Sequence, residues 1–353
     1  MRANPLAIGV IGAGRMGARH ALTVRAIDGA ELVAIADPSR LARERALSGA
    51  RARETADWRD LVGAPRDLDA VIVATPSETH AEIVVAALEA GLHVLVEKPI
   101  ATTVPDALRM IGAARESGRT LMVGHLERFN PAVRKVRHLV EEGRLGRIFR
   151  ISARRVGPQP RRVLDVGVAI DLATHDLDVM QYVLGERIER VFAEGGRFSH
   201  SRHEDLLSCV LRFSGGAHGL LDVNWVTPEK QRDLTILGEA GMVRASYLTQ
   251  EVWFYETARG RTPWQEFALF QGDGDGAVVR FAVRHIEPIR AQLEAFIDCV
   301  IQRQPAPVTG EDGLLALLGA LGLLESLESG QPMNPVERME AMVPAPARGE
   351  VGA

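Results

Sequence analysis

Residues 6–37 of the 353-residue chain read LAIGVIGAGRMGARHALTVRAIDGAELVAIAD, and this stretch decides the fold of the first half. Its opening apolar run predicts a β-strand, and a G-x-G-x-x-G pattern follows directly at the start of a helical pattern. In such a turn Gly12 permits the tight bend, Gly14 lets the backbone approach a pyrophosphate, and Gly17 lets helix and strand pack closely. Asp37 ends the next strand, where a carboxylate binds the adenosine ribose hydroxyls. The pattern predicts dinucleotide binding.

The same stretch bears on which nicotinamide cofactor is bound. The carboxylate of Asp37 repels a 2′-phosphate, which favours NAD, whereas Arg40 is close enough in sequence to serve the phosphate of NADP. We expect NAD, with NADP as the less favoured alternative. The predicted cofactor-binding residues of this stretch are Gly12, Gly14, Arg15, Met16, Gly17, Asp37 and Arg40.

Beyond this stretch the alternation of strand and helix continues. Short apolar runs at 68–75, 93–97 and 120–124 are separated by helical patterns. Strands with apolar character on both faces, joined through helices, are typical of a parallel sheet covered by helices. We therefore predict that residues 1–125 form an α/β Rossmann domain that binds NAD.

The pattern changes in the second half of the chain. Polar and apolar residues alternate with period two from 191 to 255, and Gly pairs mark hairpin turns, which predicts an antiparallel sheet with one apolar face. Residues 126–335 are predicted to form an α+β substrate and oligomerisation domain with an open, mainly antiparallel sheet. Its late helices, 287–303 and 311–329, are able to pack back on the first domain.

Two expectations follow from this half. The helical patterns are too few to cover the whole apolar face of the sheet, so a partner subunit is the expected cover and a homodimer or homotetramer the expected assembly. The Pro-, Gly- and Ala-rich end of the chain from Gln331 predicts a tail, with the domain boundary placed before residues 336–353.

Composition excludes several classes of partner. The net charge is −4, so the whole molecule offers no electrostatic footprint for nucleic acid or an anionic membrane. No apolar run reaches transmembrane length, and the first residues lack a signal-peptide pattern. Cys209 and Cys299 both lie in apolar segments, as expected of small core residues in a reducing compartment. The expected location is the cytoplasm.

The crevice at the ends of the predicted parallel strands collects polar residues. Glu97-Lys98-Pro99 follows one strand, and the Lys98 ammonium there can hydrogen-bond a substrate hydroxyl and take part in proton transfer as hydride leaves. Thr75-Pro76 ends the preceding strand and is predicted to form a wall of the nicotinamide pocket. His80, at the start of the next helix, either joins that pocket or is a satisfied histidine at a helix cap. Thr75, Pro76, His80, Glu97 and Lys98 are predicted cofactor-binding residues.

Asp171 and His175 stand four residues apart in a predicted helix and so share one face. A carboxylate that fixes the tautomer of a histidine is a usual arrangement for a general base. The polar run continues through Asp176 and Asp178, so a metal site and a structural helix end remain as alternatives. Hydride transfer to nicotinamide needs no metal, and His175 is the single nitrogen ligand in this segment, so we predict a base and no metal.

These motifs, in this order and over nearly the whole chain, resemble those of the Gfo/Idh/MocA oxidoreductases. The resemblance implies a Rossmann domain followed by an open antiparallel sheet, and oxidation or reduction of a pyranose or cyclitol. It also places Lys98, Asp171 and His175 at the catalytic positions of the family. The matching motifs are the glycine fingerprint, Thr75-Pro76 with His80, Glu97-Lys98-Pro99, Gly124-His125, Arg128-Phe129-Asn130-Pro131, Asp171 with His175, and Glu287-Pro288.

A narrower resemblance points to the UDP-N-acetylglucosamine 3-dehydrogenases of this family. It rests on VGPQPRR at 156–162, DVGVAID at 165–171, NWVTP at 224–228 and YLTQ at 247–250. Six arginines crowd residues 147–162, and guanidinium forks suit a diphosphate, although a solvated strand edge or a salt-bridge network explains them equally simply. The predicted substrate-binding residues are His125, Arg128, Arg154, Arg161, Arg162, Asn224 and Trp225.

The resulting expectation is an NAD-dependent enzyme that oxidises a ring hydroxyl of a UDP-linked N-acetylhexosamine, at C3 by resemblance. His175 would accept the hydroxyl proton and Lys98 would stabilise the charge that develops on the oxygen. The alternatives are a free sugar or inositol dehydrogenase of the same family and a non-catalytic NAD-binding regulator.

Overall fold

The computed structural model of the chain describes residues 5–63, 67–160, 166–199, 202–257 and 276–342. The chain divides into two compact units. The first unit contains Met1–Phe129, Glu287–Leu318 and Met339–Ala353, and the second contains Asn130–Ile286 and Gly319–Arg338. The late helix α10 (Gly310–Ser329) contributes to both units, whereas α9 (Pro288–Gln302) belongs to the first.

The first unit is built on a six-stranded parallel sheet, which confirms the predicted Rossmann fold. The strand order is β3-β2-β1-β4-β5-β6. All five strand pairs are parallel. The strands are β1 (Leu6–Ile11), β2 (Ala30–Ala36), β3 (Arg53–Thr55), β4 (Ala70–Val73), β5 (His93–Glu97) and β6 (Leu121–Gly124).

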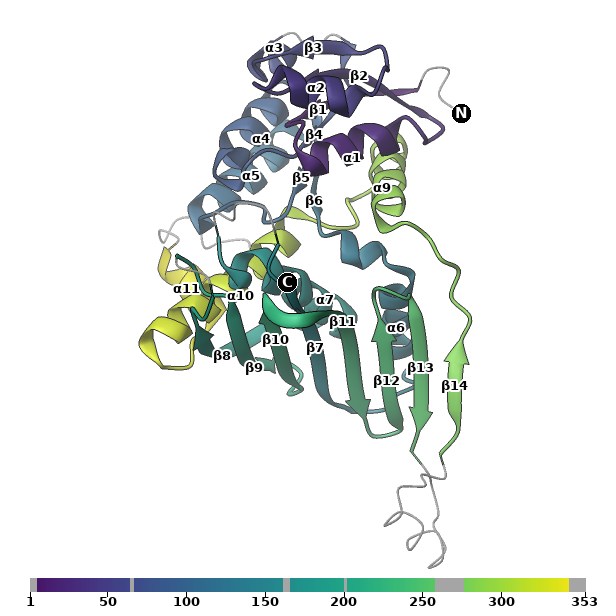
Figure 1. Cartoon of the computed structure of the whole chain (residues 1–353), viewed down its shortest axis with the longest axis vertical. Helices are drawn as coiled ribbons and strands as arrows, with labels where there is room; N and C mark the ends of the chain where they lie inside the picture. The colour runs from purple at the N-terminus through teal and green to yellow at the C-terminus, as the bar shows by residue number, and fades with distance from the viewer. Residues whose placement is uncertain (1–4, 64–66, 161–165, 200–201, 258–275, 343–353) are drawn as a thin grey trace, which may run out of the picture. The chain divides into compact units, whose positions relative to one another are not determined.

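Helices cover both faces of this sheet. Helices α1 and α2 contact each other, as do α4 and α5, and crossovers that run in opposite directions from β1 put the two pairs on opposite faces. Helix α9 contacts α1, and Figure 1 shows these two helices on the side of the sheet away from α4 and α5. The helices are α1 (Arg15–Val24), α2 (Arg40–Leu47), α3 (Arg59–Val62), α4 (His80–Glu89) and α5 (Val104–Ser117).

The second unit is built on an eight-stranded sheet in the order β14-β13-β12-β11-β7-β10-β9-β8. Within the described part of this sheet, β7 and β10 pair in parallel and the other six neighbouring pairs are antiparallel, so the predicted, mainly antiparallel sheet is confirmed. The strands are β7 (Ile148–Pro158), β8 (Ile188–Gly196), β9 (Leu206–Phe213), β10 (His218–Asn224), β11 (Val226–Gly238), β12 (Gly241–Ser246), β13 (Glu251–Glu256) and β14 (Val278–Phe281).

Helices of the same chain cover the apolar face of this sheet, which corrects the expectation that a partner subunit must do so. Helix α6 (Pro131–Glu141) contacts β12 and β13, and α7 (Thr174–Leu184) contacts β7. Helix α6 was not predicted, although Asn130 caps it by accepting a hydrogen bond from the Ala132 amide and Pro131 occupies its first turn. The core of the unit lies between the helices and the sheet.

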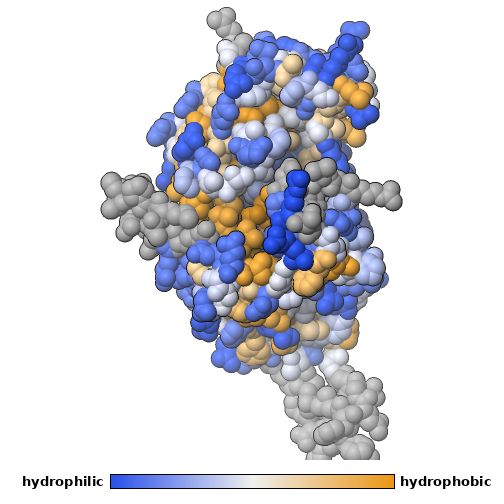
Figure 2. Space-filling view, turned by 60° about the vertical axis from the view of Figure 1, so that its left-hand side comes forward, coloured by the Kyte–Doolittle hydropathy of each residue, from blue (hydrophilic) through white to orange (hydrophobic). Residues whose placement is uncertain are grey.

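The opposite face of the second sheet is not covered by these helices. It exposes Phe149, Val210 and Leu220 among polar and charged side chains, with 39%, 49% and 39% of their surfaces accessible. Hydrophobic patches interrupt the hydrophilic surface on the molecular face shown in Figure 2 as well. Any assembly through this sheet therefore depends on a mixed open face rather than on the apolar one.

The predicted tail from Gln331 contains regular structure. Met333 forms a bridge with Val191 at the edge of the second sheet, and α11 (Pro335–Met342) follows. Asn334 starts this helix because its side-chain oxygen accepts hydrogen bonds from the Val336 and Glu337 amides. Within the described residues, every helix is either too short or too polar to span a bilayer.

Candidate functional site

The glycine turn between β1 and α1 has the geometry of a pyrophosphate cradle. Gly12 has a φ of 91°, and a Cβ on it would lie 2.7 Å from the Ala74 backbone. A Cβ on Gly17 would lie 1.7 Å from the Gly12 carbonyl oxygen, so helix and strand require glycine here. A Cβ on Gly14 would meet nothing within 4 Å. The open side of the turn, at the start of α1, therefore fits the diphosphate of a dinucleotide.

Asp37 is fixed beside this turn. One oxygen of its carboxylate accepts a hydrogen bond from the Ala13 amide at 2.7 Å, and the other accepts one from the Ser39 amide at 2.8 Å. The carboxylate thus lies at the end of β2 next to the fingerprint, as the sequence predicts. Each of its oxygens retains a lone pair, so the group can still accept a ribose hydroxyl.

Two arginines follow Asp37 in α2, and they differ in their contacts. Arg40 is 83% exposed and donates to Glu44 at 2.8 Å, and this ion pair raises the pKa of its guanidinium. Arg43, which the sequence analysis did not single out, is only 13% exposed and donates to the backbone carbonyl of Asp37 at 2.6 Å. Arg43 is therefore the arginine of α2 that is fixed against Asp37.

Glu97 and Lys98 end β5 beside a histidine that the sequence analysis missed. Nε2 of the fully buried His20 lies 2.7 Å from the Glu97 carboxylate, whose other oxygen accepts from the Lys98 amide. Burial acts to raise the pKa of Glu97, but the His20 hydrogen bond and the charge of Lys98 outweigh it and lower the pKa. Glu97 is therefore a buried anion next to a half-buried lysine.

His80 connects two loops at this edge of the sheet. Its ring lies between the Thr75 carbonyl, 3.0 Å from Nε2, and the Pro99 carbonyl, 3.0 Å from Nδ1. Burial lowers its pKa although the carbonyls favour the protonated ring. The Thr75 hydroxyl accepts a hydrogen bond from Thr79. This geometry favours the structural interpretation of His80, since it holds the Thr75-Pro76 loop against the residues that follow Lys98.

In the second unit, Asp171 and His175 lie on one continuous helical segment. Asp171 belongs to a π-helix, Ala169–Ala173, which leads directly into α7, and His175 lies in the first turn of α7. Both side chains are half-buried while their neighbours Leu172 and Asp176 are buried. π-Helical turns are rare in proteins, and those that occur often lie at functional sites. The sequence predicted the shared helix but not its widened turn.

A buried ion pair holds the start of α7 against the sheet. Nε of Arg155 lies 2.5 Å from one oxygen of Asp176, and its Nη2 lies 3.3 Å from the other. Both side chains are almost fully buried, and the guanidinium also lies over the Tyr247 ring at 5.5 Å. Because Asp176 follows His175 directly, this forked contact fixes the turn that carries His175. The sequence analysis assigned Arg155 no role of its own and counted it only among the arginines of residues 147–162.

The structure links two of the predicted substrate-binding residues of this unit, because Arg154 and Asn224 both contact the carboxylate of Asp222, each at 3.3 Å. Arg154 lies on the open face of the sheet, where it pairs with Asp222 at 3.3 Å, whereas α7 packs on the other face. The Asn224 side chain accepts from the amides of Val226 and Thr227 and so shapes its own loop. Trp225 is buried. Arg161 and Arg162 lie outside the described residues.

The remaining predicted substrate-binding residues belong to the first unit. His125 and Arg128 are both buried after β6. Arg128 forms an ion pair with Asp312 at the start of α10, with 3.0 Å between the nitrogen and the oxygen. Among the residues that the structure describes, no three His, Cys, Asp or Glu side chains are grouped to hold a metal ion.

Comparison with known proteins identifies both halves of the chain. The family model described as "Oxidoreductase family, NAD-binding Rossmann fold" matches residues 6–125, and that described as "GFO/IDH/MocA C-terminal domain" matches residues 133–244. A myo-inositol 2-dehydrogenase from Thermotoga maritima is 32% identical over 324 residues, which cover 88% of this chain and 93% of that protein.

The chain is also similar to an enzyme whose name assigns it a nucleotide-sugar substrate. A UDP-N-acetylglucosamine 3-dehydrogenase from Acidithiobacillus ferrooxidans is 28% identical over 305 residues, which cover 86% of this chain and 92% of that protein. A solved structure of the enzyme of that name from the same organism superposes with a TM-score of 0.81 at 26% identity. It covers 92% of this chain and 98% of that one.

Proposed function

The chain belongs to the Gfo/Idh/MocA family of oxidoreductases and is a sugar or polyol dehydrogenase with an NAD-binding Rossmann domain, and from that premise we propose its substrate and the roles of its residues. The proposed reaction is the NAD-dependent oxidation of a ring hydroxyl of a nucleotide-linked sugar, UDP-N-acetylglucosamine at C3. The observation that carries the chemistry is Lys98, placed beside the ionised Glu97 at the carboxyl end of β5.

The residues divide the work as follows. Bound NAD supplies the hydride acceptor. The open turn at Gly14 and the carboxylate of Asp37 bind and orient it. Lys98 donates a hydrogen bond to the substrate oxygen and stabilises the negative charge that develops there. His175, oriented by Asp171, accepts the hydroxyl proton.

The nucleotide part of the proposal has its own support. The motifs at 156–162, 165–171, 224–228 and 247–250 resemble those of UDP-N-acetylglucosamine 3-dehydrogenases, and such an enzyme is similar to this chain in sequence and in fold. Fewer arginines are available to bind a diphosphate than the sequence suggested. Arg154 and Arg155 are engaged with Asp222 and Asp176, so diphosphate binding is assigned to Arg161 and Arg162.

A free cyclitol is the second candidate substrate. The 32% identity to a myo-inositol 2-dehydrogenase favours it, and it needs no arginine for a diphosphate. Oxidation of a secondary alcohol by NAD is uphill near neutral pH, so an NADH-consuming step should be coupled to the assay. Initial rates for UDP-N-acetylglucosamine, N-acetylglucosamine, glucose and myo-inositol, followed at about 340 nm where the reduced nicotinamide absorbs, compare the two candidates directly.

The two outcomes are distinct. A higher kcat/KM for the UDP-sugar supports the proposal, and Arg161→Ala and Arg162→Ala should then raise KM more than they lower kcat, because a remote diphosphate contact is largely uniform binding. Arg109→Ala, an exposed arginine of α5 paired with Asp106, is the matched control and should leave both constants unchanged. If inositol is turned over efficiently and the UDP-sugar is not, the proposed substrate is wrong and the free cyclitol is the substrate class instead.

The proposed cofactor preference is NAD over NADP. The Asp37 carboxylate repels a 2′-phosphate, and the guanidinium of Arg40 is held by Glu44. We expect a higher kcat/KM with NAD than with NADP. Asp37→Ala should lower the ratio of the kcat/KM for NAD to the kcat/KM for NADP. A wild-type preference for NADP would instead give the dominant role to the arginines of α2, and Arg43→Ala and Arg40→Ala would show which of them carries it.

Both cysteines agree with a role as packing residues. Cys209 and Cys299 are buried free thiols, and burial raises the pKa of Cys299 to about 11. Such thiols are inert, as is usual for structural cysteines in a reducing compartment. A cytoplasmic location is accordingly the proposed one.

A further inference from the structure

The carboxyl end of β5 is contacted by a histidine from another element. His20 lies in α1, the helix that follows the glycine turn, and its side chain is fully buried. Its Nε2 lies 2.7 Å from Oε1 of Glu97, whereas Oε2 of Glu97 accepts a hydrogen bond from the Lys98 amide at 3.3 Å. The two oxygens of one carboxylate thus connect α1 to the residue that is proposed to contact the substrate.

The hydrogen-bond roles in this contact follow from charge. Burial acts to raise the pKa of Glu97, but several interactions outweigh it, and the hydrogen bond from His20 is the largest of them. An ionised carboxylate only accepts hydrogen bonds, so Nε2 of His20 carries a proton and is the donor. Nδ1 of His20 is buried without a hydrogen-bond partner among the described residues. Within that part of the chain, Glu97 is therefore the group that the ring serves.

The neighbouring strand confines the same carboxylate. Gly124 of β6 pairs with Glu97, and a Cβ on Gly124 would lie 3.3 Å from Oε2 of Glu97 and 3.2 Å from its Cα. Glycine at this position leaves the room that the carboxylate fills. Glu97 is consequently held between α1 and β6, with 8% of its surface accessible.

A carboxylate in this position depends on its donors. Burial penalises the charged form, so a buried carboxyl that loses its hydrogen bond either takes up a proton or moves toward water. Either change would alter the charge beside Lys98, to which Glu97 is attracted. His20 can therefore act on Lys98 without contacting the reacting atoms.

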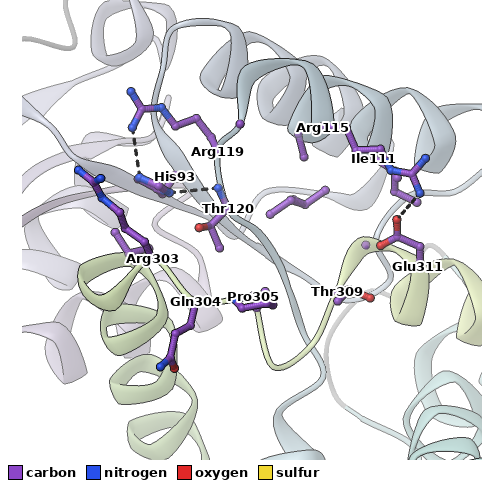
Figure 3. Close-up of a pocket in the computed structure, with 16 residues that line it drawn as sticks. His93, Ile111, Arg115, Arg119, Thr120, Arg303, Gln304, Pro305, Thr309 and Glu311 are labelled. Carbon is purple, nitrogen blue, oxygen red and sulfur yellow. Dashed lines mark hydrogen bonds and ion pairs between the residues drawn. The ribbon is translucent and has the colours of Figure 1, made fainter.

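A second histidine lies at the opposite end of β5 and provides a comparison. His93 begins the strand, and its Nδ1 accepts a hydrogen bond from the Thr120 amide at 3.1 Å. Figure 3 shows both residues in the lining of a pocket of about 640 Å³. The five residues of β5 separate this end from Lys98 by roughly 13 Å at about 3.3 Å per residue. His93 thus supports the same strand at a place remote from Lys98.

We propose that His20 is a positioning residue for Lys98, which it holds in place through the carboxylate of Glu97. The proposal rests on the proposed role of Lys98 in the oxidation, but it does not depend on which sugar or cyclitol is oxidised. The alternative is a purely structural role, in which His20 only fastens α1 to β5.

The test measures kcat with whichever substrate the wild type oxidises. His20→Leu removes the donor and keeps a side chain of similar size, and we expect kcat to fall about 10-fold, because small displacements of a group that contacts the substrate are costly. The KM for the substrate and the Kd for NADH should change by less than about 3-fold. His20→Gln keeps an N–H donor at the end of its side chain and should restore kcat to within about 3-fold of the wild type.

A double-mutant cycle separates the two roles of His20. If His20 acts through Lys98, His20→Leu should lower the kcat of Lys98→Met by less than about 2-fold, since the group that His20 positions is already absent. His93→Leu is the control, because it removes a hydrogen bond from the other end of β5 and should leave kcat within about 2-fold of the wild type. If His20→Leu does not fold, His20→Asn takes its place, since its amide is too short to reach Glu97.

Several results overturn the proposal. They are a wild-type kcat in His20→Leu, a loss of about 10-fold in both the wild-type and the Lys98→Met backgrounds, no rescue by His20→Gln, or an equal loss in His93→Leu. Failure of the proposed mechanism looks different, because Lys98→Met would then keep a nearly wild-type kcat, and this inference would fall with it. If Lys98→Met lowers kcat by at least ~10²-fold and the losses multiply, only the assignment of His20 is wrong.

Discussion

Lys98 follows a carboxylate that is buried and yet ionised, and that pairing sets the electrostatics of the strand end. His20 and Lys98 together lower the pKa of Glu97 against the effect of burial. The opposite charges of Glu97 and Lys98 attract each other across this strand end. In the proposed mechanism Lys98 donates a hydrogen bond to the substrate oxygen, while His175 accepts the proton.

Replacing Lys98 separates chemistry from binding. Lys98→Met should lower kcat by at least ~10²-fold, the lower range for the loss of one proton-transfer or charge-stabilising partner, while the Kd for NADH changes little. Steady-state kinetics and a fluorescence titration with NADH measure the two quantities. Lys230→Met, at an exposed position of β11, is the control. A variant with nearly wild-type kcat would remove Lys98 from the chemistry.

Replacing Gly17 and Gly14 of the fingerprint by alanine should affect different properties of the protein, stability in the first case and NADH affinity in the second. Gly17→Ala places a Cβ 1.7 Å from the Gly12 carbonyl oxygen, so we expect a lower midpoint of thermal unfolding. Gly14→Ala meets no protein atom within 4 Å, so its unfolding should resemble the wild type, while its affinity for NADH falls at least ~10-fold because the methyl group occupies the approach of the diphosphate. Equal effects on stability would contradict this division.

The role of a single residue is best predicted from sequence where the backbone geometry allows only one residue type. The roles of Gly12 and Gly17 follow from spacing alone, and the structure supplies the clashes that explain them. Arg154 and Arg155 show the limit. Alternation along β7 predicts that neighbours point to opposite faces, but which face α7 covers depends on tertiary packing. Sequence therefore could not tell that Arg155 is the buried partner of Asp176.

Among the secondary-structure elements, the first turn of α10 shows how one buried carboxylate holds a helix start. Thr309 and Asp312 cap each other's amides, and Asp312 also pairs with Arg128. Burial acts to raise the pKa of Asp312, but the charge of Arg128 and the hydrogen bonds from Thr309 and Arg128 outweigh it and lower the pKa from its ordinary value. Its ionised form therefore stabilises the fold fully above the unfolded-state pKa, and this contribution is lost as pH falls through the lower, folded-state value.

Asp312→Asn should reduce the free energy of unfolding by about 1 to 2 kcal/mol at neutral pH, because it removes a charged hydrogen bond from the buried Arg128. As pH falls below about 4 the difference from the wild type should shrink, because the unfolded state then binds a proton at Asp312, and the difference is lost once pH passes the lower, folded-state pKa. Denaturant unfolding at a series of pH values measures both effects. Glu311→Gln, whose partner Arg115 is solvent-exposed, should cost less than about 0.5 kcal/mol.

Elements with strong local signals were predictable, and those shaped by contacts were not. The helical pattern predicted between the apolar runs at 93–97 and 120–124 corresponds to α5, which Thr103 caps and Gly118 ends. Helix α6 carried equally clear signals in Asn130 and Pro131, but those residues were assigned only to a family motif. The π-helical turn at Asp171 has no sequence signal of its own, because a widened turn arises from how the segment packs.

For the whole molecule, the open face of the second sheet leads to a prediction about assembly. Phe192, Val210 and Leu220 lie in one cross-strand row of β8, β9 and β10. Light scattering at micromolar concentration should give a dimer or tetramer, and Leu220→Arg should yield a smaller species with an unchanged unfolding midpoint. Leu248→Arg, an exposed leucine outside the strands, is the control. A wild-type monomer would show that this face stays in solvent.

The division of the first unit between distant segments affects how the ribosome delivers the protein. Arg19 of α1 pairs with Glu287, 268 residues later, and the amide of Val123 in β6 bonds to the carbonyl of Val308. At roughly 5–20 residues per second, the partner of Arg19 emerges on the order of tens of seconds after it. The eight strands of the second unit have left the tunnel by then and can pair with one another, whereas the Rossmann sheet still lacks its last helix. The second unit in turn is completed only when Gly319–Arg338 emerges.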